Sequence, residues 1–304
     1  MSFERFVCPR CRGELLAREQ EAVCASCGTG YPQQDGILHL TAGKTGAPGF
    51  DPHYFDTLAE IEGSHFWFVV RRQVILDALR RGVPDLERRR LFDIGCGSGG
   101  LLAFLDRQGV PVEGACDAYR ESLEIVRRRV AAPLVLVDEG RLPPLAPGHT
   151  LLGLFDVLEH IDDDEGTLRF LNSILAPGGV LVLTVPAHPF LFDEMDELAH
   201  HRRRYRKRDL RRLLEAAGFR VRVLSHFMSP LVPPLVVVRW LGRTLFGRTC
   251  GQERRRAEFR VVPGLNGLLR HVLTLERLWI RLAPSIPVPF GSSLVAVAAR
   301  EGRP

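Results

Sequence analysis

Short apolar runs alternate with amphipathic stretches through the central part of the chain, from about residue 53 to residue 227. The short runs have the length of buried strands, and the amphipathic stretches have the 3.6-residue period of helices. This alternation predicts βαβ units around a mainly parallel sheet. The expected strands are 91–94, 112–116, 133–137, 151–155 and 180–185, and the expected helices are 119–130, 164–175 and 207–217.

The two ends of the chain differ from this centre. The first forty residues are rich in cysteine and too few to hold themselves together by apolar burial alone. Beyond residue 228 the pattern is irregular until the apolar run 293–298, which predicts a strand that returns to the sheet. We therefore expect a head at 1–40, a Gly- and Pro-containing linker at 41–52, and an α/β domain at 53–304 with a helical insertion at 228–290.

Composition places the chain among ordinary globular proteins. Of its 304 residues, 45% are hydrophobic and 25% are charged. The N-terminus lacks the basic region and apolar stretch of a secretion signal, and the scattered cysteines suit a reducing compartment, so we expect a cytoplasmic protein. The net charge of +5 favours acidic partners only weakly.

Four of the seven cysteines form two CxxC pairs, each followed closely by a glycine. Two such pairs can place four thiolates tetrahedrally around Zn²⁺, in a closed site of structural type. The expected zinc ligands are Cys8, Cys11, Cys24 and Cys27. With the segments 28–32 and 35–38, this region resembles the zinc ribbons of the methyltransferase-activator family, which are free-standing or fused to methyltransferases.

A glycine-rich turn follows the first expected strand of the central region. The sequence Asp93-Ile94-Gly95-Cys96-Gly97-Ser98-Gly99-Gly100 lets a ligand lie against the backbone at the start of a helix. Its spacing also fits the dinucleotide fingerprint, with Asp117 at a suitable distance to hold a ribose. Spacing alone therefore leaves NAD and S-adenosylmethionine (SAM) open. Asp93 would repel phosphates but can accept hydrogen bonds from an ammonium group, which favours SAM.

The segment from Asp93 to Gly99 resembles the DxGCGxG motif of class I SAM-dependent methyltransferases, and the match continues through DVLEH at 156–160 and LxPGG at 175–179. The resemblance covers roughly residues 90–186 and implies a doubly wound, Rossmann-like α/β fold. It also implies that Asp117 bonds the ribose hydroxyls and that Asp138 lies beside the adenine amino group. Thr150 departs from the aspartate that usually opens the fourth strand. The implied cofactor-binding residues are Asp93, Gly95, Cys96, Gly97, Gly99, Asp117, Asp138 and Asp156.

Two further segments resemble a bacterial methyltransferase subgroup. The stretch 65–68 with Arg71 resembles its HFWF-x-x-R segment, a helix that lids the cofactor, although such aromatics also serve as simple packing. The stretch 196–205 resembles its D…HxRRY segment on the acceptor side, or it is a solvated, charged loop. The resemblance makes His160 and His201 the candidate general bases.

The same region resembles a metal-binding constellation of small-RNA 2′-O-methyltransferases and ubiquinone-pathway O-methyltransferases. That resemblance implies Mg²⁺ or a similar ion at Asp156, Glu159, His160 and His201, where it would lower the pKa of a bound hydroxyl. Many methyltransferases with the DVLEH segment use no metal, so a metal-free site stays open.

The sequence thus predicts methyl transfer from SAM to an O, N or C nucleophile of a small or lipid-linked acceptor. The apolar, Pro-broken stretch 227–246 ends in interface-type Arg and Trp residues, so it predicts either peripheral contact with the inner face of a membrane or burial in a helical cap. Arginine clusters spread along the chain and interrupted by acids make nucleic acid a weaker candidate partner. An RNA or ribosomal-RNA methyltransferase and a non-catalytic activator of another methyltransferase remain the alternatives.

Overall fold

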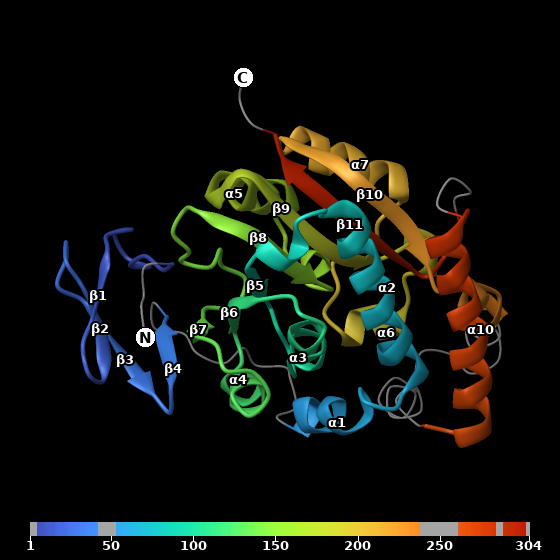
Figure 1. The fold of residues 1–304 in the computed structure, drawn as a ribbon. Helices are drawn as coiled ribbons and strands as arrows, with labels where there is room; N and C mark the ends of the chain where they lie inside the picture. The colour runs from blue at the N-terminus through green and yellow to red at the C-terminus, as the bar shows by residue number, and fades with distance from the viewer. Residues whose placement is uncertain (1–4, 42–52, 238–260, 284–287, 302–304) are drawn as a thin grey trace.

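The computed structural model describes residues 5–41, 53–237, 261–283 and 288–301. Within them, one long sheet carries helices on both faces (Figure 1). The strands are β1 (Leu15–Ala17), β2 (Glu21–Cys24), β3 (Gly30–Gln34), β4 (Ile37–Leu40), β5 (Leu91–Ile94), β6 (Val112–Asp117), β7 (Leu134–Val137), β8 (His149–Phe155), β9 (Leu175–Pro186), β10 (Phe219–Phe227) and β11 (Ser293–Arg300).

The helices of the described residues connect these strands. The α-helices are α1 (His53–Ile61), α2 (Phe66–Gly82), α3 (Gly100–Arg107), α4 (Arg120–Val126), α5 (Asp164–Ile174), α6 (Glu194–Leu198), α7 (Lys207–Ala216) and α10 (Pro263–Leu282). Short 3₁₀ turns are η1 (Leu86–Arg88), η2 (Leu158–His160), η3 (Pro189–Leu191) and η4 (Ser229–Leu231).

The sheet has the strand order β1-β2-β3-β4-β7-β6-β5-β8-β9-β11-β10. Pairing is parallel from β4 through β9, and β11 and β10 close the far end in antiparallel register. This confirms the predicted doubly wound α/β fold. Because the strand order reverses direction at β5, the carboxyl ends of β5, β6 and β8 form the edge where ligands bind in such folds.

Two apolar clusters hold the layers together. One lies under α5 and α7, and the other lies under α2, α3, α4 and α10. The central strands read as continuous apolar runs because both of their faces are buried. Val180, Leu181, Val182 and Leu183 of β9, for example, are fully inaccessible to solvent and belong alternately to the two clusters.

The cysteine-rich head extends the same sheet. Its strand β4 pairs in parallel with β7, from Ile37 opposite Leu134 to Leu40 opposite Val137. Phe6 packs edge-on against Phe92 of β5 at 5.7 Å between ring centroids. The head therefore shares the core of the α/β domain, which supplies the apolar burial that its own few residues lack.

Some element boundaries differ from those expected. Helix α4 ends at Val126 and not at residue 130. The backbone N–H groups of Arg128 and Arg129 bond the carbonyls three residues earlier, as in a tighter 3₁₀ turn. Strand β9 begins five residues before residue 180, and strand β10 was not among the expected strands. Nearly all of the expected linker 41–52 and part of the stretch 227–246 lie outside the described residues. In the part of the chain that the structure describes, no helix combines the length and apolarity needed to cross a bilayer.

Candidate functional site

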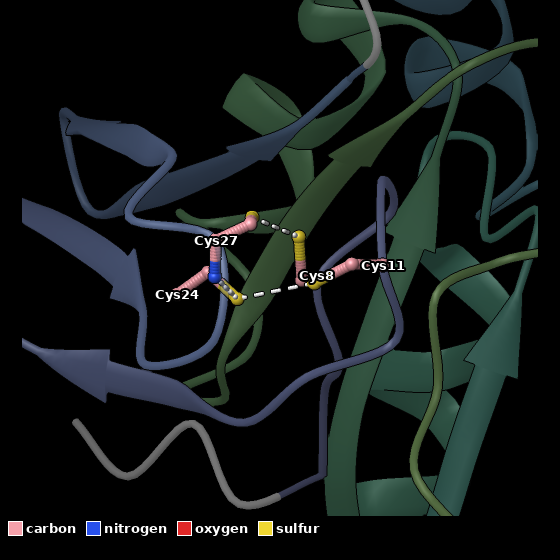
Figure 2. A group of neighbouring side chains, drawn as sticks. All are labelled: Cys8, Cys11, Cys24 and Cys27. Atoms are coloured by element: carbon pink, nitrogen blue, oxygen red, sulfur yellow. Dashed lines mark hydrogen bonds between the residues drawn. The ribbon is translucent and has the colours of Figure 1, made fainter.

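The four head cysteines converge on one point (Figure 2). Their Sγ atoms all lie within 4.8 Å of one another. Cys8 and Cys27 are 3.7 Å apart at sulfur, and Cys11 and Cys24 are 3.4 Å apart, far longer than a disulfide bond. Four thiolates bound tetrahedrally to Zn²⁺ at about 2.3 Å lie about 3.8 Å from one another. The observed spacing is therefore close to that of a Cys₄ zinc site.

Hydroxyl groups lie beside two of these sulfurs. Tyr31 is buried, and its hydroxyl lies 3.1 Å from Cys8 Sγ, while the Thr29 hydroxyl lies 3.2 Å from Cys27 Sγ. The Thr29 hydroxyl lowers the pKa of Cys27 to about 6. Such outer partners favour the thiolate form that a metal requires.

The glycine turn after β5 has the backbone conformation that only glycine adopts easily. Gly95, Gly97 and Gly99 have φ values of +72°, +52° and +73°. A side chain at Gly95 would collide with Val157, and one at Gly99 would collide with Val126. Gly97 has open space where its side chain would be, which leaves room for a ligand against the backbone. The neighbouring Cys96 is partly buried.

Two carboxylates lie beneath this turn. Asp117, at the end of β6, accepts hydrogen bonds from the backbone N–H groups of Gly97 at 2.8 Å and Tyr119 at 3.0 Å. Asp93 in β5 is almost inaccessible, and its Oδ1 atom has no hydrogen-bond partner among the described residues. Burial raises the pKa of Asp93 to about 7 and that of Asp117 to about 6. A cationic ligand would stabilise both groups in their charged form.

A third carboxylate, that of Glu62, lies at the N-terminus of α3. It accepts a hydrogen bond from the Ser98 hydroxyl at 2.6 Å and pairs with Arg129. A side chain at Gly100 would collide with it. In dinucleotide-binding folds this helix end holds the pyrophosphate. Here the ion-paired side chain of Glu62 occupies that place, which opposes a dinucleotide and agrees with a cofactor that has no phosphate. Nothing in the sequence signals this role, because Glu62 lies far from the turn along the chain.

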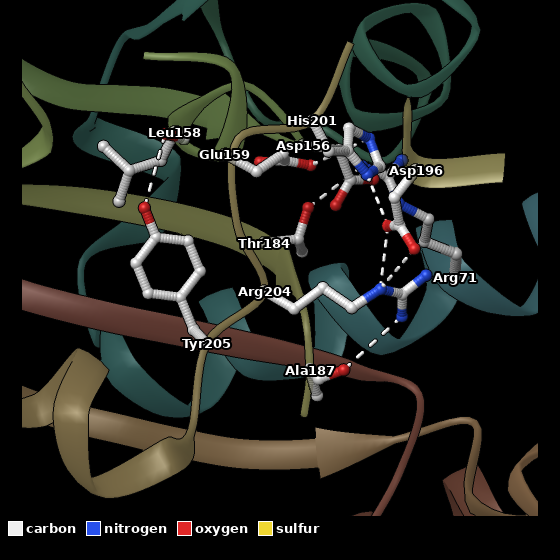
Figure 3. Close-up of polar contacts among 10 residues, drawn as sticks. All are labelled: Arg71, Asp156, Leu158, Glu159, Thr184, Ala187, Asp196, His201, Arg204 and Tyr205. Carbon is white, nitrogen blue, oxygen red and sulfur yellow. Dashed lines mark hydrogen bonds and ion pairs between the residues drawn. The ribbon is translucent and has the colours of Figure 1, made fainter. Parts of the chain in front are cut away.

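The remaining expected cofactor residues follow β7 and β8. Asp138 comes directly after β7 and pairs with Arg141 at 3.5 Å. Asp156 comes directly after β8 in a left-handed conformation, and its carboxylate pairs with Arg71 of α2 at 2.6 Å. Arg71 is buried and also donates to the Thr184 hydroxyl, so α2 is tied to the carboxyl edge of the sheet (Figure 3).

A buried acid and two imidazoles meet beside Asp156. Ligand atoms of Glu159, His160 and His201 all lie within 4.8 Å of one another. Glu159 is fully buried, and neither of its carboxylate oxygens has a hydrogen-bond partner among the described residues. Burial raises the pKa of Glu159 well above its ordinary value and lowers the pKa of His160 to about 4. Of the four residues expected to hold a metal, three are brought together, and Asp156 is engaged by Arg71.

The orientation of His201 is fixed by a buried carboxylate. Asp196 accepts from His201 Nδ1 at 2.8 Å and from Arg204 Nε at 2.7 Å (Figure 3). Asp196 is itself held by a capping box at the start of α6. The other ring nitrogen of His201, Nε2, lies 3.9 Å from Glu159 Oε1. Within 196–205, Asp196 and Tyr205 are buried, whereas Glu197, His200 and Arg202 are exposed.

A second imidazole pair was missed by sequence reasoning. His188 follows β9 and His226 lies near the end of β10, and their rings stack at 5.1 Å between centroids. The Nε2 atoms of both are buried without a hydrogen-bond partner among the described residues. Burial lowers the pKa of His226 to about 4. The only sequence signal was two isolated histidines, 38 positions apart, which are brought together by the antiparallel β9-β11-β10 arrangement.

The sequence is similar to those of known methyltransferases. The chain is 27% identical over 164 residues to the ubiquinone biosynthesis O-methyltransferase of Cupriavidus pinatubonensis, covering 49% of this chain and 65% of that protein. It is 33% identical over 154 residues to the protein of the same name from Psychrobacter cryohalolentis, covering 46% and 56%. The chain thus matches less than two thirds of the length of either relative.

A solved structure and a family model point the same way. Haemonchus contortus phosphoethanolamine N-methyltransferase 2, in complex with S-adenosyl-L-methionine, superposes with a TM-score of 0.51 at 16% identity, covering 83% of this chain and 58% of that one. At this identity the likeness concerns the fold. The family model described as a methyltransferase domain matches residues 69–224, from α2 to β10, which is about half of the chain. The chain therefore belongs to the methyltransferase-domain family, with the fold of SAM-dependent methyltransferases.

Proposed function

We propose that this chain transfers a methyl group from SAM to a hydroxyl oxygen of a small or lipid-linked acceptor. The observation that carries the proposal is the cluster of Glu159, His160 and His201. It follows β8 at the carboxyl edge of the sheet, the same edge at which the glycine turn follows β5. Imidazoles beside a buried acid suit the removal of a proton from a hydroxyl. The O-methyltransferase relatives support oxygen over nitrogen or carbon as the methylated atom.

The glycine turn would hold the cofactor. Asp93 and Asp117 would accept from its ammonium and ribose groups, Asp138 would lie beside its adenine, and the backbone at Gly97 would pack against it. When bound, SAM supplies a methyl group on a sulfonium that departs as a neutral thioether. The protein's own task is to align the acceptor and exclude water, and Arg71 fixes Asp156 and α2 at that edge.

A divalent cation fits the acceptor side. The two unpartnered oxygens of buried Glu159, with one nitrogen each from His160 and His201, form a mixed oxygen and nitrogen donor set. Such an ion would lower the pKa of an acceptor hydroxyl. His160 or His201 would otherwise take the proton directly, with Asp196 stabilising the imidazolium of His201.

We further propose that residues 1–40 form a zinc ribbon with a structural ion on Cys8, Cys11, Cys24 and Cys27. The α/β part, 53–304, would be the catalytic domain, with 228–290 as an insertion on the acceptor side. Exposed Val236 and Val237 support membrane contact by the stretch 227–246, of which residues 238–246 lie outside the described part.

The test uses a catechol as probe, because it carries the adjacent hydroxyls that a metal can hold. We expect 3,4-dihydroxybenzoate to be methylated in the presence of SAM and Mg²⁺ or Mn²⁺. Glu159→Gln and His201→Ala should each lower the rate at least about 100-fold, the loss typical of an acid–base group, while SAM affinity measured by calorimetry stays unchanged. Glu165→Gln, an exposed acid on the nearby α5, is the matched control.

Labelled SAM with a fractionated lipid and metabolite extract covers acceptors other than catechols. Label in a hydroxylated small molecule or lipid supports the proposal. Label confined to RNA, or no label in any fraction, would contradict it.

A further inference from the structure

A basic groove lies on the face opposite the methyltransferase site, at the amino ends of the central strands. One depression of about 740 Å³ is lined by the end of α2, η1 and the start of β10. A second depression, of about 480 Å³, adjoins it and shares Arg220 and Arg222 with it. Because β5 and β9 run parallel, this edge is separated from the glycine turn by the full length of the strands.

Positive charge in the groove exceeds negative charge two to one. The two depressions are lined by six arginines and by three acids, namely Asp85, Glu87 and Glu301. Among the described residues of the groove, Asp85 and Arg89 form an ion pair, with 2.8 Å between the carboxylate oxygen and the guanidinium nitrogen. The arginines are Arg81, Arg88, Arg89, Arg220, Arg222 and Arg300.

Two of these guanidinium groups are held by backbone carbonyls and pair with no carboxylate among the described residues. Arg222 donates to the Gly82 carbonyl at 2.9 Å, and Arg300 donates to the Ser173 carbonyl at 3.1 Å. Arg89 donates to the Gly178 carbonyl at 3.1 Å in addition to its pairing with Asp85. A carbonyl fixes the orientation of a guanidinium without cancelling its charge. Burial together with the charges of Arg220 and Arg89 lowers the pKa of Arg222. The positive charges in the groove therefore repel one another.

We propose that this groove binds an oligophosphate, a ligand with two or more linked phosphate groups. A guanidinium group of fixed orientation can bind two oxygens of one phosphate group. A ligand that engages several such arginines at the same time therefore needs several phosphate groups. The volume of the groove is in the range of small-ligand sites. The ligand is a free polyphosphate or the phosphate chain of a nucleotide, which share this chemistry. The site does not depend on the acceptor proposed above.

Calorimetric titration of the full chain with inorganic tripolyphosphate tests the proposal. We expect one site, weakened at least about tenfold by Arg88→Gln/Arg220→Gln. Both arginines are exposed, and neither side chain has a hydrogen bond or ion pair among the described residues, so their replacement by glutamine should leave the fold intact. The matched control is Arg127→Gln/Arg128→Gln, which removes the same charge beyond the end of α4 and should leave the affinity unchanged.

A parallel titration with GTP distinguishes the two sources. Tighter binding of GTP than of tripolyphosphate identifies a nucleotide, and equal affinities identify free polyphosphate; either result supports the site. SAM affinity should be the same in all variants. Absence of tripolyphosphate binding at about 50 mM salt, where screening is weak, would overturn the proposal. Equal weakening by both double variants, or binding of an RNA oligonucleotide without binding of tripolyphosphate, would overturn it as well.

Discussion

Asp93 and Asp117 are carboxylates kept in a poor environment for negative charge. Both lie under the glycine turn with almost no exposure to solvent, and burial raises the pKa of each. Stabilising hydrogen bonds reach Asp117 from the backbone, whereas Asp93 Oδ1 has none among the described residues. A cation bound beside these carboxylates would offset the free-energy cost of burying their negative charge. Their burial therefore supports a positively charged cofactor.

Asp93→Asn should separate stability from binding. The folded pKa of about 7 lies above the usual value of 3.8, so the stability that the protonated Asp93 contributes is fully present below about pH 4 and is lost as pH rises from there to about 7. Without cofactor, the melting temperature of the wild type should therefore fall between about pH 4 and pH 7, and that of the variant should fall less. SAM affinity should drop by about 1 to 3 kcal/mol, the cost of a lost charged partner.

Thermal melts across this pH range and SAM calorimetry measure the two effects. Asp106→Asn, an exposed acid on the adjoining α3, serves as the control and should change neither. Identical pH profiles for the wild type and Asp93→Asn would show that Asp93 is not the strained group.

At the scale of elements, β4 and β7 join the head to the α/β domain. β7 would otherwise be the edge of the parallel sheet, with its backbone groups unpaired. Arg5 continues the contact, because its guanidinium pairs with Glu113 of β6 at 2.8 Å and Glu113 also binds buried His149. Disorder in the head would therefore expose the strand from which Asp138 follows.

Removing the proposed zinc of the head should destabilise the whole chain. Elemental analysis of dialysed protein should find about one zinc per chain, because a closed site uses all four thiolates. Cys24→Ser should lose the ion and lower the melting temperature, since metal binding and folding of such small modules are coupled. Cys250→Ser, outside the CxxC pairs, should do neither. Zinc-free protein with an unchanged melting temperature would refute this role.

The elements also show where sequence reasoning succeeds. The glycine turn was predictable from its glycine spacing, and α5 and α7 were predictable from their local amphipathic period. Asp163 also caps α5 by accepting a hydrogen bond from Gly166 N–H. The pairing of β4 with β7 was not, because Ile37–Leu40 is a short apolar run whose partner lies almost a hundred residues away. The positions of Glu62 and of the His188–His226 pair depend on such long-range contacts, so no local pattern marks them.

At the scale of the whole molecule, three chemically different regions occupy separate parts of one sheet. The cysteine cluster lies beyond β4 at one end, the carboxylates and imidazoles lie at the carboxyl edge, and the arginine groove lies at the amino edge. The net charge of +5 thus conceals a negative region around the glycine turn and a positive one opposite. A cationic ligand and a polyanionic ligand would be steered to different faces.

We propose that the glycine turn between β5 and α3 binds SAM. Isothermal titration of the wild-type chain with SAM, and separately with NADH, distinguishes this cofactor from a dinucleotide. We expect about one SAM per chain to bind with an affinity in the micromolar range, and NADH to give no heat, because the carboxylates of Asp93 and Asp117 lie under the turn and the ion-paired Glu62 occupies the helix end where a pyrophosphate would bind. Binding of NADH without binding of SAM would contradict it.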